Sequence, residues 1–182
     1  MKKVSHETIY DKKHIQLFLD ISSTNSGVVI YREESQEVLL DSINLKNLHK
    51  LPQMKQVDFE KVKIGCIKNY LDALKSLYEI DVVYIEGIFI HPAFRKSSEV
   101  LLKIHGFLMG YFLDTPCMYI PPANIKKAIT GKGNADKCKV KDVLEKYYQY
   151  EFENNDESDA FALLVTTHGW NNYIIQGGEI EC

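Results

Sequence analysis

The apolar positions of the N-terminal third form short runs separated by polar turns, a pattern typical of β-strands. Residues 14–21 are mostly apolar, and the small, polar turn SSTNSG separates them from a second apolar run at 28–31. A polar turn at 33–36 precedes a third run that begins EVLL. Short connections between successive strands favour antiparallel pairing, so this part of the chain predicts a three-stranded meander.

The pattern changes to a helical period after the third run. Between Met54 and Tyr78, apolar side chains recur at spacings of three and four, which predicts a long amphipathic helix. Residues 81–85 then form a short apolar strand. A helix followed by a buried strand is typical of a crossover connection, so we expect this fourth strand to run parallel to its neighbour.

The second half of the chain predicts mainly helices. Residues 94–112 have apolar positions at helical spacing, and 117–120 form a fifth strand that ends at two prolines. The rest is expected to be helical apart from the loop GKGNAD and the helix start NND. The predicted order is β-β-β-α-β-α-β-α-α. It describes an α/β fold with a five-stranded mixed sheet, three antiparallel strands then two parallel ones, flanked by helices.

Length and composition indicate one domain. The 182 residues, 45% of them hydrophobic, suffice for one core, and no Pro/Gly/Ser-rich stretch indicates a linker. We expect a polar arm at 1–13, a folded domain at 14–172 and a tail at 173–182. No apolar run is long enough to cross a bilayer and the start lacks the apolar centre of a signal peptide, which predicts a cytoplasmic protein. The scattered cysteines predict reduced thiols.

Charge is distributed unevenly along a chain whose formal net charge is −3. The segment 126–141 has one acid, Asp136, and six lysines: 126, 127, 132, 137, 139 and 141. The next segment, 142–159, has one lysine and seven acids. Such a pair of segments fits a protein that grips a phosphate backbone beside a metal-binding centre. It fits two ordinary solvated faces equally well.

Four carboxylates occupy positions that packing alone does not explain. Asp20 closes the first predicted strand, Glu86 closes the fourth, and Asp156 and Asp159 open the last helix, three residues apart on one face. Carboxylates gathered in one place repel each other unless a cation or a proton neutralises them. All-oxygen ligands suit Mg²⁺ or Mn²⁺. The pattern therefore predicts a two-ion phosphoryl-transfer site, although N-capping is a competing explanation for Asp156.

Two further features have weaker implications. The turn after Asp20 is built of small residues that let a polyanion approach backbone amides, but such turns are common. Phe89 lies in the expected loop beyond Glu86, where an exposed aromatic ring could stack on an unpaired base, whereas most aromatic side chains belong to the core.

The motifs DISSTNSG, IEGIF, IKKAITGKGNADKCKV and ESDAFAL, spread from Ile15 to Trp170, resemble those of a known family. It is the family of RuvC-type Holliday junction resolvases, which have the RNase H-like nuclease fold. The lysine- and glycine-rich stretch carries most of the resemblance, because a strand-end Asp alone is common. The turn after Asp20 differs from the DPGS of the bacterial enzymes and is closer to that of phage-encoded relatives.

The resemblance implies a function and a site. It implies an RNase H-like nuclease domain over 14–172, working as a homodimer that binds two Mg²⁺ ions per site, with Mn²⁺ as a possible substitute, and nicks opposing strands of a four-way DNA junction. The products would carry 5′-phosphate and 3′-hydroxyl ends. The implied catalytic and metal residues are Asp20, Glu86, Asp156 and Asp159, with Lys126 and Lys137 also catalytic. The implied DNA-binding residues are Phe89, Lys126, Lys127, Lys132, Lys137 and Lys139.

Three other functions stay open from the sequence. A nuclease of the same fold could act on branched or flap DNA or on structured RNA, since the metal site is indifferent to the shape around the phosphate. A sugar kinase or related ATPase could use the same strand-end Asp, but such proteins usually need two related domains. A junction-binding protein without catalysis would have no use for four clustered acids. Sequence preference, dimer contacts and a helicase partner are not predicted.

Overall fold

The computed structural model describes residues 13–88 and 95–177 and contains a six-stranded mixed sheet. The strand order is β5-β4-β1-β2-β3-β6. β1, β2 and β3 pair antiparallel, β4 lies parallel to β1, and β5 lies parallel to β4. The bounds are β1 Lys13–Asp20, β2 Asn25–Arg32, β3 Glu37–Asn44, β4 Tyr78–Glu86, β5 Cys117–Ile120 and β6 Ile174–Gly177. The predicted meander and parallel crossover are thus confirmed.

The prediction of five strands was wrong, because β6 adds a sixth. It pairs parallel to β3, and the Ile174 amide donates to the Gln36 carbonyl at 2.9 Å. β6 has only four residues, IIQG, and none of them is fully buried. Strands of this kind lack an alternating pattern, so only the arrival of the chain beside the open edge of β3 makes this segment a strand.

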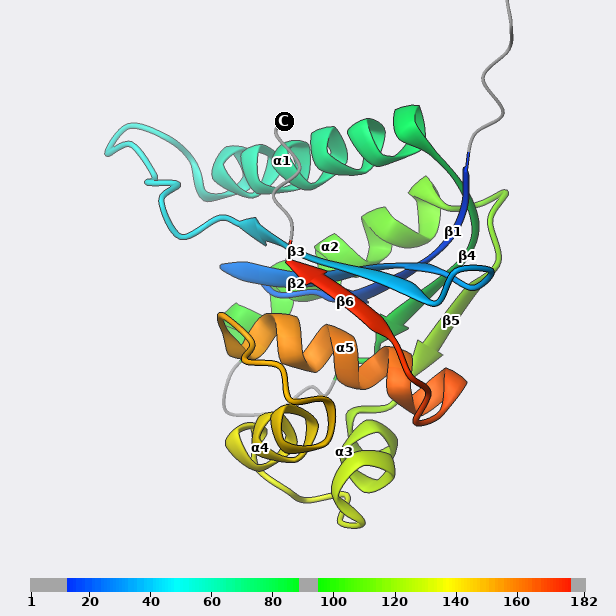
Figure 1. The fold of residues 1–182 in the computed structure, drawn as a ribbon. Helices are drawn as coiled ribbons and strands as arrows, with labels where there is room; N and C mark the ends of the chain where they lie inside the picture. The colour runs from blue at the N-terminus through cyan, green and yellow to red at the C-terminus, as the bar shows by residue number, and fades with distance from the viewer. Residues whose placement is uncertain (1–12, 89–94, 178–182) are drawn as a thin grey trace, which may run out of the picture.

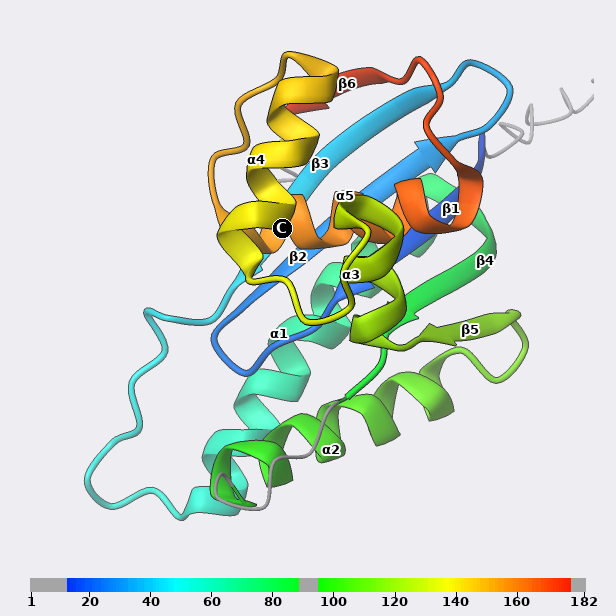
Figure 2. The ribbon, with the colours of Figure 1, turned by 90° about the horizontal axis from the view of Figure 1, so that it is seen from below.

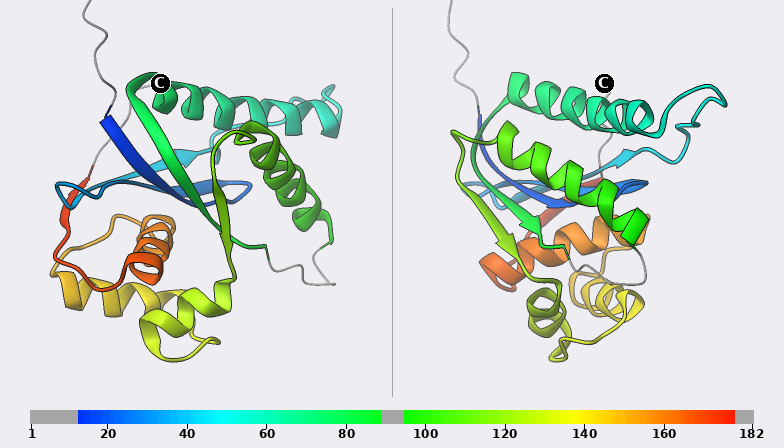
Figure 3. Two further views of the ribbon diagram at one scale, coloured as in Figure 1. Left: turned by 90° about the vertical axis from the view of Figure 1, so that its right-hand side faces the viewer. Right: turned by 180° about the vertical axis from the view of Figure 1, so that it is seen from behind.

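Helices cover both faces of the sheet (Figures 1 and 3). α1 (Gln56–Leu77) and α2 (Arg95–Tyr111) lie on one face. α3 (Pro122–Thr130), α4 (Lys137–Tyr148) and α5 (Asn155–His168) lie on the other, one helix more than the predicted order, because GKGNAD and NND each interrupt the helical segment. None of the helices in the described ranges is both long enough and apolar enough to cross a membrane.

Two hydrophobic cores follow from the alternation of side chains along the central strands. Leu17 and Leu19 face α1 and α2, whereas Phe18 between them faces the other helices and stacks on Tyr84 with ring centroids 4.7 Å apart. The side chains of Leu17, Phe18 and Leu19 are all fully buried. Because β1 is central and covered on both sides, the position of its last residue, Asp20, is set by packing on two faces.

α5 packs directly on the sheet where Gly27 leaves room for it. Gly27 pairs with Asp20 across β1 and β2. A Cβ at this glycine would lie 1.8 Å from the carbonyl oxygen of Asp156, at the start of α5. The first turn of α5 therefore packs against the backbone of β2 with no side chain between them. This contact places Asp156 close to the end of β1, where Asp20 lies.

Candidate active site

Asp20 and Glu86 meet at one edge of the sheet because β1 and β4 are parallel. Leu19 pairs with Ile85, so the two acids that follow are neighbours at the carboxyl ends of their strands. Asp20 is only 7% exposed. Burial raises the pKa of Asp20 well above its usual value, and the charge of Glu86 and a hydrogen bond shared with it raise that pKa further. The pair needs a proton or a cation.

α5 brings the second pair of acids to the same place. Its N-cap is Asn154, whose side chain accepts from the amide of Glu157 at 2.9 Å, so capping does not account for Asp156. The Asp156 carboxylate instead accepts from the Asn25 side chain at 2.6 Å. Asp156, Asp20 and Glu86 line one hollow of about 220 Å³. Three of the four predicted carboxylates therefore face a common space.

Lys137 links the fourth carboxylate to this group. Its ammonium donates to Asp159 and lies 3.8 Å from Asp20. Burial raises the pKa of Asp159 to about 6, because it outweighs the opposing effect of the lysine. Burial lowers the pKa of Lys137, but the negative charges of Asp20 and Asp159 have the larger, opposite effect, so that the pKa of the lysine is raised. One cation thus already lies among the acids.

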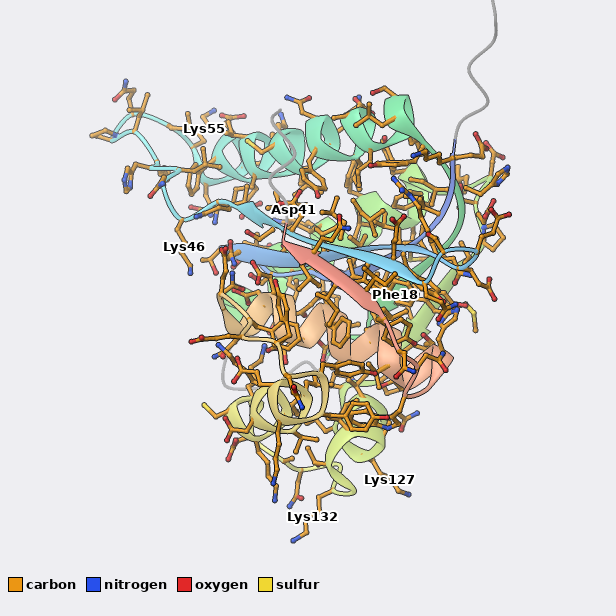
Figure 4. The ribbon with its side chains drawn as sticks, viewed as in Figure 1. Phe18, Asp41, Lys46, Lys55, Lys127 and Lys132 are labelled. Carbon is orange, nitrogen blue, oxygen red and sulfur yellow. The ribbon has the colours of Figure 1, made fainter. Side chains whose placement is uncertain are left out.

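The other predicted lysines lie outside this cluster. Lys126 is half-buried on α3, and no described acid forms an ion pair with it. Three others are exposed and extend the positive charge along the α3–α4 side: Lys127, Lys132 and Lys139. Figure 4 labels the first two of them. Phe89, predicted to stack on DNA bases, lies outside the described residues.

Three residues at the site were not singled out from the sequence. Asn25 holds Asp156, Gly27 admits α5, and His105 of α2 lines the hollow, buried and with its Nδ1 lacking a partner among the described residues. Asn25 and Gly27 both belong to the segment SSTNSG, which was predicted as a turn, although β2 already begins at Asn25. Their contacts depend on α5, which is more than 100 residues away in sequence.

The donor chemistry fits divalent metal ions. The acids offer carboxylate oxygens, the ligands that Mg²⁺ and Mn²⁺ prefer, and Lys137 stands where a cation neutralises them. Within the described part of the chain, no three His, Cys, Asp or Glu side chains are grouped closely enough to ligate an ion as they stand. Asp156 is turned to Asn25 and Asp159 to Lys137, so metal binding requires these contacts to be exchanged.

A larger hollow, about 680 Å³, lies at the opposite end of β1 and has no part in this cluster. Its charged groups largely neutralise one another, with Arg32 paired to Glu37 at 2.8 Å and His14 to Asp81 at 2.7 Å. We therefore place the site at the smaller hollow, where three carboxylates and Lys137 meet and where burial raises the pKa values of Asp20 and Asp159.

Comparison with known proteins identifies a family that matches most of the chain. The family model described as crossover junction endodeoxyribonuclease RuvC matches residues 17–168. The RuvC of Christiangramia forsetii is 27% identical over 179 residues, 94% of this chain and 88% of that protein. The RuvC of Orientia tsutsugamushi is 29% identical over 158 residues, 84% and 93% of the two chains.

Solved structures share the fold. A Thermus thermophilus RuvC bound to a Holliday junction substrate superposes with a TM-score of 0.58 at 16% identity, covering 84% of this chain and 91% of that one. The yeast mitochondrial Holliday junction resolvase Ydc2 superposes with a TM-score of 0.56 at 12% identity, covering 87% and 79%.

Proposed function

Because the chain belongs to the family of crossover junction endodeoxyribonuclease RuvC, we propose that it is an endonuclease that resolves four-way DNA junctions. The observation that carries the proposal is the meeting of Asp20, Glu86 and Asp156 at one hollow, inside the segment that the family model matches. Clustered carboxylates beside a lysine are suited to phosphodiester hydrolysis, in which negative charge on the phosphate must be neutralised.

Two Mg²⁺ ions, for which Mn²⁺ can substitute, would be held by Asp20, Glu86, Asp156 and Asp159. Bound there, they supply a water of lowered pKa and charge stabilisation for the leaving oxygen, giving 5′-phosphate and 3′-hydroxyl ends. The protein's own contribution is placement. The strand ends hold Asp20 and Glu86 in register, and the close packing of α5 on Gly27 holds Asp156 beside them.

Lys137 is proposed to contact the scissile phosphate when the ions replace it between Asp159 and Asp20. Lys126, Lys127, Lys132 and Lys139 would bind the flanking backbone, and Phe89 would stack on a base near the junction centre. Positive charge aimed at the phosphate is most effective where the transition state gains negative charge.

Replacing Lys137 separates its catalytic role from general DNA affinity. We expect Lys137→Gln to slow junction cleavage by about 10²- to 10³-fold, the loss typical of one charge-stabilising group, while junction affinity changes only a few-fold. Single-turnover cleavage and binding of the same labelled junction measure the two effects. Lys146→Gln, at the far end of α4, is the matched control. Equal losses of rate and affinity would make Lys137 an ordinary phosphate contact.

Metal binding should be visible without any DNA. Mg²⁺ should raise the melting temperature of the wild-type protein by several degrees, because an ion at about 100 times its dissociation constant adds about 2.7 kcal/mol of stability. Potassium chloride at matched ionic strength is the control for screening. A Glu86→Gln variant should lose most of the shift, and an undiminished shift in that variant would place the ions elsewhere.

A homodimer is proposed because paired nicks on opposing strands of a two-fold symmetric junction need two related sites. Mapping both nicks on one junction, together with sedimentation of the protein, tests this point. Cuts at opposed positions in a two-chain species are the expected result.

Substrate choice is tested with a panel of labelled four-way junction, fork, flap, linear duplex and structured RNA, each with and without Mg²⁺. The expected result is metal-dependent cutting of the junction in preference to all others. Faster cutting of flap DNA or RNA would overturn junction resolution and retain a nuclease, and no cutting with either Mg²⁺ or Mn²⁺ would leave a binding protein.

A further inference from the structure

The loop between β3 and α1, residues 45–55, carries positive charge that the site described above does not use. Segment 42–57 contains three lysines and a histidine but no acidic residue, in a chain with a formal net charge of −3. Lys46, Lys50 and Lys55 are all exposed. None of them forms an ion pair within the described ranges. The nearby Lys61, in contrast, forms one with Asp58, with Nζ and Oδ1 3.6 Å apart. We call these three residues the loop lysines.

The loop is attached to the turn that follows Asp20. The amide of Leu45 donates to the carbonyl of Thr24 at 2.7 Å, and Lys63 of α1 donates to the carbonyl of Ser23 at 2.5 Å. Leu45 is buried and Leu48 packs against the core, so both ends of the loop's first turn are held. The start of the loop, which carries Lys46, is therefore held next to the turn that follows Asp20, and the rest of the loop leads from there to α1.

The views show where this loop lies relative to the other lysines. It projects from the end of the molecule at which α5 begins, beside the β1–β2 turn (Figures 1 and 2). Figure 4 shows Lys46 beside the end of the sheet and Lys127 and Lys132 at the outer side of α3. Unpaired lysines thus lie on two sides of the carboxylate cluster, one set on the loop and the other on α3 and α4.

We propose that the loop lysines form a second DNA-contact surface, which binds the phosphate backbone of a duplex arm on the side of the active site opposite α3 and α4. This inference rests on the proposed action on branched DNA, since a branched substrate presents arms on more than one side of the cut. The occupant is a polyanion because the surface offers three ammonium groups that form no ion pair within the described ranges, on a segment, 42–57, without an acidic residue.

The three charges are expected to act through the backbone and not through base sequence. Lysines on an exposed loop offer mobile point charges without the fixed fork of arginine, which suits phosphate contacts. Each phosphate contact releases condensed counterions, so three contacts should contribute about 2.7 to the slope of log affinity against log salt concentration. This slope can be measured without cleavage.

The test compares two triple variants of the full chain with the wild type. One is Lys46→Gln, Lys50→Gln and Lys55→Gln, and the control is Lys13→Gln, Lys68→Gln and Lys146→Gln, which removes the same charge away from the site. Binding of a labelled four-way junction is measured over a salt series without divalent metal. For the loop variant, we expect the slope of log affinity against log salt concentration to become shallower by about 2 to 3, and the affinity at low salt to fall at least about tenfold. For the control, we expect the slope to change by less than about one.

A loop variant with the wild-type slope and affinity would overturn the proposal, as would an equal loss in the control, which would indicate a general effect of net charge. Equal melting temperatures of the three proteins exclude misfolding as the cause. Failure of the proposed function has a different signature, because the wild type would then cut no junction in Mg²⁺ whatever the loop variant binds.

Discussion

Asp20→Asn should abolish junction cleavage, by about 10³-fold or more, while junction binding stays within a few-fold of the wild type. The side chain keeps its size, and its amide can donate to Glu86 without a shared proton. It loses the negative charge at the point where Glu86, Asp156 and Lys137 meet. Without that charge the cluster binds divalent ions poorly.

The same substitution should leave the metal-free protein at least as stable as the wild type. Burial and the charge of Glu86 raise the pKa of Asp20, so folding disfavours its ionised form and the amide removes that cost. Melting curves without metal measure stability, and single-turnover assays in Mg²⁺ measure cleavage. Cleavage at near the wild-type rate would remove Asp20 from the active site.

Asp41→Asn is the matched control for this experiment. Asp41, labelled in Figure 4, is another buried carboxylate of the sheet, on β3. It accepts from the Tyr70 hydroxyl at 2.7 Å. An amide there replaces a charged acceptor within a structural hydrogen bond, so we expect lower stability with cleavage preserved at temperatures where the protein is folded. The two variants should thus show opposite patterns of stability and activity.

Gly27→Ala should reduce cleavage by at least about 10²-fold, because misplacement of reacting groups by about 1 Å has an effect of this size. The added Cβ would lie 1.8 Å from the carbonyl oxygen of Asp156 and 3.1 Å from the Cβ of Ala160. Backbone atoms on both sides must separate, which displaces the first turn of α5. Asp156 and Asp159 then move relative to Asp20, while the lysines of α3 and the loop stay available for DNA.

Stability should fall as well, by about 3 kcal/mol, at the upper end of the range for overpacking. Gly65→Ala is the control, since a Cβ in the middle of α1 meets nothing within 4 Å and should stabilise the helix by about 0.5 to 1 kcal/mol. Chemical unfolding and cleavage below the melting range measure the two effects. A folded Gly27→Ala protein with full activity would show that α5 need not touch the sheet for catalysis.

Most of the strand arrangement could be predicted from local pattern. The mostly apolar run at 14–21 indicated the first strand, and the helix before β4 indicated a crossover to a parallel strand; the structure shows that β1 is this parallel neighbour. β6 could not be predicted, because its four residues have no alternation and depend on the free edge of β3. A strand pairing of this kind is a long-range contact.

The candidate site divides in the same way. Asp156 and Asp159 were found by their spacing on one helix face, but the sequence left capping open, and only the hydrogen bond that the Asn154 side chain accepts from the Glu157 amide shows which residue caps α5. The lysine-rich segment suggested positive charge near the acids but fitted an ordinary solvated face equally well. It could not show that Lys137 alone of that segment reaches Asp159 and Asp20.

By itself, the sequence determined which residues carry charge and which elements carry those residues, because strand and helix periods are local properties of the chain. The tertiary structure decided which charges meet. Asp20 and Asp156 lie more than 100 residues apart, and their approach depends on a helix packing against the bare backbone of Gly27. It also brought the start of the loop that carries Lys46 next to the turn after Asp20. Such contacts arise from packing over the whole core, so no local pattern encodes them.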